Sequence, residues 1–415
     1  MSTKTTLAII LSLVLVAFAG TGWFFLNRSG SNILGTSDNG SSFSPFGIFD
    51  NREKGSGTND GVSNNGEGTQ TGEANTNQLK KQKLLKLSPR PTAGFIVFER
   101  ASSTIVRYVE KENGHVQEIN TSSLESKRLT NTTIPKIHEA IFSDKGESVL
   151  LRYLKEEDNI IQTYSAKIQT SATTSDEGIL VGSFIDENIN QIAVSPDKLK
   201  IFTLINYGNS SVGSISFFDG SKKSQIFQST FTEWLPQWVE GDVIFLNTKP
   251  SSSVFGFNYS ITVKNPALIK VIGKKYGLTT LLSPDGNRAV FSENNEGGLS
   301  LSVFNKKTKT TYSLGLATLS EKCVWSSNNI STYCAVPETT PRVPGGYPDS
   351  WYQGLISFSD TVWKIDTESG ATDQLANLRE ISREQIDVTS PQINQNGDKF
   401  VFINKTDNSL WLLSL

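Results

Sequence analysis

From about residue 84 to the C-terminus, short apolar runs alternate with turns that are rich in Ser, Pro, Asp, Asn and Gly. Runs this short, rich in β-branched and aromatic residues, indicate strands and not helices. The clearest example is Leu-Leu at 281–282, followed by Ser-Pro-Asp-Gly at 283–286 and Ala-Val-Phe at 289–291. Pro presets φ, Asp bonds its own backbone and Gly supplies a positive φ, so this phrase predicts a tight turn between two strands.

The phrase recurs about every 45 residues, which is a period typical of stacked supersecondary units. The positions equivalent to Ser143 lie near residues 99, 143, 195, 239, 283, 326 and 394. Most copies are followed by two more strand-like runs, such as 301–304 and 310–314. Four short strands in each repeat predict the blades of a β-propeller.

With these Ser-Pro-Asp turns, at 283–286 and 195–197 above all, the chain resembles the TolB-like and WD40-like β-propeller families, whose PD40-type repeats carry the same turn. The resemblance covers roughly residues 83–415 and implies an all-β propeller of seven four-stranded blades, with six or eight blades as alternatives. Another antiparallel β fold with Asp-Gly turns remains possible. The resemblance also implies a bacterial origin and protein–protein contacts at the cell envelope, by analogy of fold.

The strand count predicts how the ring closes. The last repeat ends with its third strand, at 410–413, and so lacks a fourth. The run Leu84-Leu85-Lys86-Leu87, just before the first repeat, can supply it. We expect the two ends of the propeller to share one blade, because this pairing removes an exposed edge.

The N-terminus predicts a membrane anchor over residues 1–28. Residues 6–26 carry no charge, and about 20 apolar residues suffice to span a bilayer. Lys4 precedes the segment and favours a cytoplasmic N-terminus, which places the propeller at the cell surface or in the periplasm. A cleaved signal peptide is the alternative, because Ala17-Phe18-Ala19 fits a cleavage site; the apolar run at 23–26 continues past it and favours an uncleaved anchor.

Residues 29–78 consist mostly of Gly, Ser, Asn and Thr, which bury too little apolar surface to fold and predict a flexible linker. The propeller domain then spans 79–415. The whole chain has 39 basic and 41 acidic residues, a net charge of −2, and no basic stripe, so nucleic acid is not an expected partner.

The two cysteines, Cys323 and Cys334, flank the turn at 327–330 and face each other across the predicted hairpin. Directly opposed positions lie close enough for a cross-strand disulfide, which an exported domain permits. Two buried free thiols are the alternative. The pair lacks the usual spacing of metal ligands, so no metal site is predicted.

Catalytic signals are weak. The chain has two histidines, His115 and His138, and no nucleophile elbow, zinc-binding helix, P-loop or dinucleotide fingerprint. We therefore predict neither catalytic residues nor a cofactor.

The spacing from 326 to 394 is the longest between repeats and contains an insertion, residues 337–360, with four Pro and three Gly. Long loops in compact folds are usually functional or disordered. Tyr, Trp and Arg carry most of the energy at interfaces. The candidate binding residues are Arg342, Tyr347, Asp349, Trp351 and Tyr352. The alternative, to which we give equal weight, is a loop that caps its own blade with Trp351.

Three functions follow from these features. The favoured one is a membrane-tethered extracytoplasmic propeller that binds or scaffolds an envelope protein through the insertion. The second is an exported propeller hydrolase acting on glycans or peptides, which requires carboxylates from several blades at the channel. The third is a structural spacer.

Overall fold

The computed structural model describes residues 82–415, except for 156–158, 171–176 and 296–297. These residues belong to one compact unit, Asn59–Leu415. The predicted anchor of residues 1–28 and the predicted linker of residues 29–78 lie outside the described residues. In the part of the chain that is described, no helix is both long and apolar enough to cross a membrane.

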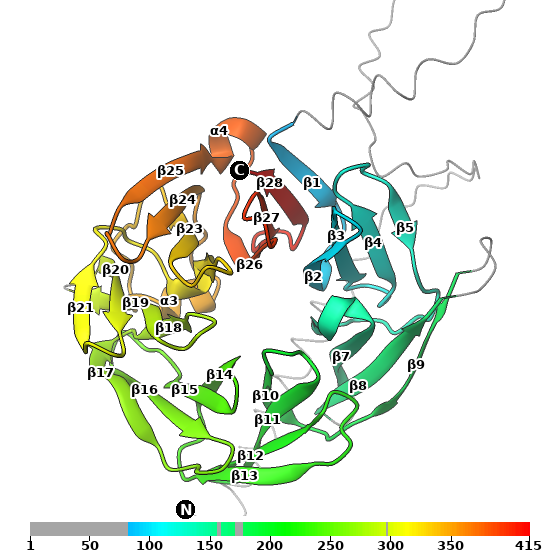
Figure 1. Cartoon of the computed structure of the whole chain (residues 1–415), viewed down its shortest axis with the longest axis horizontal. Coiled ribbons are helices and arrows are strands. Elements are labelled where there is room, and N and C mark those ends of the chain that lie inside the picture. The colour runs from blue at the N-terminus through cyan, green and yellow to red at the C-terminus, as the bar shows by residue number, and fades with distance from the viewer. Residues whose placement is uncertain (1–81, 156–158, 171–176, 296–297) are drawn as a thin grey trace, which may run out of the picture. The chain divides into compact units, whose positions relative to one another are not determined.

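The described strands form seven four-stranded antiparallel sheets, which confirms the prediction of a seven-bladed β-propeller (Figure 1). Blade 1 holds β2 (Thr92–Arg100), β3 (Ser103–Glu110), β4 (Val116–Asn120) and β5 (Ser126–Arg128). Blade 2 holds β6 (Glu139–Phe142), β7 (Ser148–Lys155), β8 (Ile160–Gln169) and β9 (Ile179–Phe184). Blade 3 holds β10 (Ile189–Val194), β11 (Lys200–Tyr207), β12 (Ser210–Phe217) and β13 (Ser224–Ser229).

The other four blades repeat this order. Blade 4 holds β14 (Trp234–Glu240), β15 (Val243–Thr248), β16 (Phe255–Thr262) and β17 (Ile269–Tyr276). Blade 5 holds β18 (Thr279–Leu282), β19 (Arg288–Asn295), β20 (Gly298–Asn305) and β21 (Thr310–Ser313). Blade 6 holds β22 (Cys323–Trp325), β23 (Ser331–Pro337), β24 (Asp360–Asp366) and β25 (Thr372–Asn377). Blade 7 holds β26 (Val388–Ile393), β27 (Lys399–Asn404), β28 (Leu410–Ser414) and β1 (Leu84–Ser88).

Short helices lie in some of the described connections between these strands. They are η1 (Asp144–Gly146), η2 (Ser320–Lys322), α3 (Asp349–Tyr352) and α4 (Leu378–Ser382).

Blade 7 closes the ring as the strand count predicts. β1 pairs antiparallel with β28, with Leu84 opposite Leu413 and Lys86 opposite Trp411. The N–H of Ser414 also donates to the carbonyl of Lys83 at 2.8 Å. Strands from the two ends of the propeller therefore lie side by side in Figure 1, and the last blade has its full four strands.

Apolar side chains fill the space between neighbouring blades. Between blades 3 and 4, Phe202 and Ile244 are fully buried, and Trp234 and Trp238 pack in the same cluster. These two tryptophans, on either side of Pro236, therefore belong to the core. Burying a side chain such as Phe202 stabilises the fold by about 1.5–3 kcal/mol.

The recurring turn is built by its Ser and Asp side chains. Ser283 Oγ accepts the N–H of Arg288 at 2.9 Å and donates to Asp285 at 2.5 Å, and Ser195 makes the same two bonds with Lys200 and Asp197. In both copies the N–H of the residue three positions after the serine donates to the serine carbonyl, at 2.8 Å. In these two blades the same short sequence therefore closes the same turn.

Candidate functional site

The predicted insertion joins β23 to β24 in blade 6 and contains α3. It is tied to blade 4 through Ser252, whose N–H donates to Asp349 Oδ2 at 2.6 Å and whose hydroxyl donates to the carbonyl of Gly345. Within the insertion, Tyr347 donates to the carbonyl of Pro341 at 2.5 Å. The insertion is therefore held to a blade far from its own in sequence.

Two of the five candidate binding residues are buried. Tyr347 is fully buried and Trp351 is 4 % exposed, and both pack with Leu319 and Phe358 in one apolar cluster. A buried ring is not available to a partner, so Tyr347 and Trp351 do not have the surface position that their candidate role requires. They pack the insertion onto the propeller.

A buried charge cluster lies beneath Trp351. Lys322, on η2, reaches Asp360 Oδ2 at 2.8 Å and Asp387 Oδ1, and all three side chains are fully buried. Lys322 also donates to the carbonyl of Val388 at 3.0 Å, and Trp351 Nε1 donates to Asp387 Oδ2 at 2.9 Å. The cluster joins blade 6 to blade 7 and fixes the ring of Trp351.

Two carboxylates share a single ammonium in this cluster. Burial raises the pKa of Asp360 from 3.8 to about 6, because desolvation outweighs the attraction of Lys322 and the nearby Asp387 adds to the rise. Asp360 Oδ1 has no hydrogen-bond partner among the described residues. Neither Lys322 nor Asp387 belongs to a repeated motif, so the sequence carries no signal that points to them.

The outer side of the insertion carries the remaining candidates. Tyr352 is 38 % exposed and donates its hydroxyl hydrogen to Glu321, and burial raises the pKa of Glu321 to about 7. Arg342 is exposed and Asp349 is half-buried. Leu355, an apolar residue outside the predicted set, is 68 % exposed. The insertion thus presents an aromatic, a basic and an apolar side chain to solvent.

The two cysteines face each other on β22 and β23. Cys323 lies directly opposite Cys334, their Cα atoms are 4.0 Å apart, and the structure joins them in a disulfide. The bond links the first strand of blade 6 to β23, the strand that leads into the insertion.

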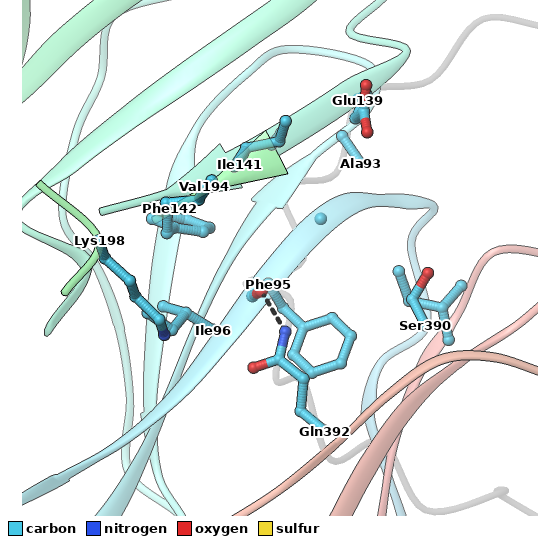
Figure 2. A pocket seen from close by; sticks show the side chains of 13 residues that line it. Ala93, Phe95, Ile96, Glu139, Ile141, Phe142, Val194, Lys198, Ser390 and Gln392 are labelled. Atoms are coloured by element: carbon cyan, nitrogen blue, oxygen red, sulfur yellow. Dashed lines mark hydrogen bonds between the residues drawn. The ribbon is translucent and has the colours of Figure 1, made fainter. Parts of the chain in front are cut away.

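The second candidate site is a pocket of about 320 Å³ in the channel, between the inner strands of blades 1, 2, 3 and 7 (Figure 2). Its wall is mostly apolar, with Phe95, Ile96 and Phe142 among the lining side chains. The polar side chains that line it are Glu139, Lys198, Ser390 and Gln392.

Gln392 joins two blades across this pocket. Its Nε2 donates to the carbonyl of Phe95 at 2.8 Å, and its Oε1 accepts the N–H of Val97 at 3.0 Å. Figure 2 draws the first of these bonds as a dashed line. Gln237 makes the same pair of bonds between blades 4 and 5, with Thr280 and Leu282. The shared pattern indicates that Gln392 holds the blades together.

The charged side chains of the pocket differ in their partners. Glu139 forms an ion pair with Arg152, which also donates to the carbonyl of Ile189 in blade 3. Lys198 is half-buried, and the opposite charge that acts on its ammonium group is the carboxylate of Asp144. Within the described residues, no group of three or more His, Cys, Asp or Glu side chains could hold a metal ion.

No protein-family model and no curated protein matches this sequence. Among solved structures, an oligogalacturonate lyase from Vibrio parahaemolyticus is 11 % identical, with a TM-score of 0.53 over 80 % of this chain and 93 % of that one. The propeller domain of the Trilobed protease from Pyrococcus furiosus is 13 % identical, with a TM-score of 0.50 over 78 % of this chain and 95 % of that one.

TolB from Acinetobacter baumannii is also similar, at 11 % identity and a TM-score of 0.43 over 65 % of this chain and 63 % of that one. At these identities the likeness extends to the β-propeller fold alone. The Pyrococcus domain is described as having an open velcro topology, whereas β1 and β28 pair here. The comparisons therefore agree with the fold that the repeats predict. The function has to be inferred from the residues of the candidate sites.

Proposed function

We propose that this protein is a membrane-tethered, extracytoplasmic binding or scaffolding module of the bacterial cell envelope. The uncharged segment at 6–26 supports the tether, and the Gly/Ser/Asn-rich stretch at 29–78 supports a linker between the membrane and the propeller. The propeller binds an envelope protein through the outer side of the insertion at 337–360.

One observation carries this proposal: the insertion is held in place from several blades and still exposes side chains suited to an interface. Ser252 of blade 4 holds Asp349, and Asp387, at the start of blade 7, holds Trp351. A loop that is already ordered loses little conformational entropy when it binds, which favours affinity. Tyr352 and Leu355 then offer an aromatic and an aliphatic contact on a rigid support.

The hydrolase alternative requires carboxylates from several blades around the channel. Glu139 is the acidic residue among those that line the described pocket, and it is paired with Arg152. The described channel therefore gives this alternative no specific support, and we favour the binding function.

The test is crosslinking mass spectrometry on intact cells with the full-length chain. We compare the wild-type protein with the double variant Arg342→Glu/Leu355→Asp, which changes exposed side chains only. Ile269→Asp is the matched control, because Ile269 is 60 % exposed on β17, outside the insertion. We expect one specific crosslinked protein in the wild type and the control, and its loss in the double variant. An unchanged set of crosslinks in the double variant would falsify the assignment of the surface.

A further inference from the structure

Lys198 stands at a turn position that glycine or asparagine occupies in the four other turns of the same kind. In five of the described turns, the N–H of the same position donates to the carbonyl three residues earlier, at 2.8–3.2 Å. That position has a positive φ in every case. The residues are Gly146, Lys198, Gly286, Asn329 and Gly397. Gly and Asn adopt this left-handed conformation readily, whereas a residue such as Lys is destabilised in it by about 1–2 kcal/mol.

The space beside this position is filled at the three glycines. A Cβ atom would lie 3.2 Å from Ile96 Cγ2 at Gly146, 2.8 Å from Glu240 Oε2 at Gly286, and 3.2 Å from the hydroxyl oxygen of Tyr333 at Gly397. Each of these contacts comes from the preceding blade, so a side chain at any of the three glycines would have to displace its neighbour. At Lys198 the preceding blade is blade 2, and the space there belongs to the channel pocket.

The lysine side chain enters that pocket. Figure 2 shows Lys198 extending from its turn along the pocket wall formed by Phe142 and Ile96. Burial lowers the pKa of Lys198, while the carboxylate of Asp144 acts in the opposite direction. Arg152 pairs with Glu139, so Lys198 is the charged lining residue without an ion-pair partner in the lining itself; the opposite charge that acts on it, Asp144, lies outside the lining.

We propose that the channel pocket binds a small organic anion, a carboxylate or phosphate attached to an apolar body, with the Lys198 ammonium on the anionic group. The side chains of Phe95, Ile96 and Phe142 contact the apolar part. A volume of about 320 Å³ lies at the lower end of the range for small-molecule pockets, about 300–1,000 Å³. The site lies apart from the insertion, so it is independent of the proposed protein partner.

The unfavourable backbone of Lys198 gives the proposal a second, independent consequence. If Lys198 serves binding and not stability, replacing it with glycine should have two effects. It removes the backbone strain, which raises the melting temperature, and it removes the charge that binds the anion. Lys145 is the matched control: it has a φ of 50° in the neighbouring turn of blade 2, is exposed, and does not line the pocket.

The experiment is calorimetric titration of the full-length chain with 4-phenylbutyrate, phenyl phosphate and the neutral 4-phenylbutanamide. We expect one site for at least one of the anions and no measurable binding of the amide. The tighter anion identifies the ligand class as carboxylate or phosphate. Because a charge-assisted hydrogen bond is lost, Lys198→Gly and Lys198→Met should weaken the binding by about ten- to a hundredfold. Lys145→Gly should leave it unchanged.

Melting temperatures of the same variants complete the test. We expect both glycine variants to melt higher than the wild type, and only the one at 198 to lose the anion. The proposal is overturned if neither anion binds, if the amide binds as tightly as the anions, or if Lys198→Gly keeps the wild-type affinity. Lys198→Met keeps the length of the side chain, so it answers the question even if the glycine variant fails to fold.

Discussion

Replacing Lys322 with methionine should destabilise the protein strongly at neutral pH and weakly at acidic pH. Lys322 is fully buried between Asp360 and Asp387, and methionine has a similar length but no charge. Its loss removes the buried counter-charge of both carboxylates, while the half-buried Lys405 still interacts with Asp387. Removing one partner of a buried pair typically costs about 3–5 kcal/mol, which for a domain of this size corresponds to a fall in melting temperature of about 4–7 °C.

The pH dependence follows from the raised pKa of Asp360. A pKa of about 6 in the folded state, against 3.8, means that the native state keeps a proton that the unfolded state has released between these values. Stability therefore falls as pH rises through this window, by about 3 kcal/mol for this group. Without Lys322 the pKa of Asp360 rises further, so the loss of stability in Lys322→Met should be much smaller at pH 5 than at pH 8.

The assay is thermal unfolding of the full-length chain at pH 5 and pH 8, followed by intrinsic fluorescence. Lys405→Met is the comparison, because Lys405 also interacts with Asp387 but is only half-buried, and its ammonium lies over the same Trp351 ring, 5.0 Å from the centroid. Lys322→Met/Asp360→Asn restores the charge balance and should recover part of the loss. An equal loss at both pH values, or a loss no larger than that of Lys405→Met, would refute the reasoning.

Three further predictions concern other parts of the fold. Glu321→Gln should raise the melting temperature above pH 7 and leave it nearly unchanged near pH 4. The reason is that the raised pKa of Glu321 makes the stability of the wild type fall as pH rises towards 7, and a pH series of melting curves checks this. Reducing the Cys323–Cys334 bond should cost about 2–4 kcal/mol, measured by unfolding with and without reductant, and an unchanged curve would argue against the bond. Deleting residues 84–88 removes β1 and exposes the edge of β28, so we expect lower stability and concentration-dependent association in sedimentation velocity, whereas a monomer of wild-type stability would contradict the closure.

The fold could be predicted because its signal is local and repeated. Each Ser-Pro-Asp turn closes through bonds within a few residues, such as Ser283 with Asp285 and Arg288, so its sequence is readable without the rest of the chain. The role of β1 could also be predicted, because the last repeat has three strands and the run before the first repeat can supply the fourth. Neither inference needs a contact between distant side chains.

The charge cluster and the orientation of the insertion could not be predicted in this way. Lys322 and Asp387 are 65 positions apart, and no motif relates them. Tyr347 and Trp351 are aromatic residues in a Pro- and Gly-rich loop, a composition that suits both an exposed interface and a loop packed on its own blade. Only the packing against Leu319 and Phe358 decides between them.

Lys198 could be predicted from the sequence in part. Its unusual place is visible in the sequence, because a lysine follows Ser-Pro-Asp at 195–197, whereas Gly286 follows the same three residues in blade 5. What the sequence lacks is the shape of the neighbouring blade, which at Gly146 and Gly397 fills the adjacent space and at Lys198 leaves the pocket. In a repeat protein the equivalent positions act as internal controls, so a residue that differs from them and also lines a pocket is a stronger functional signal than an aromatic side chain in a loop.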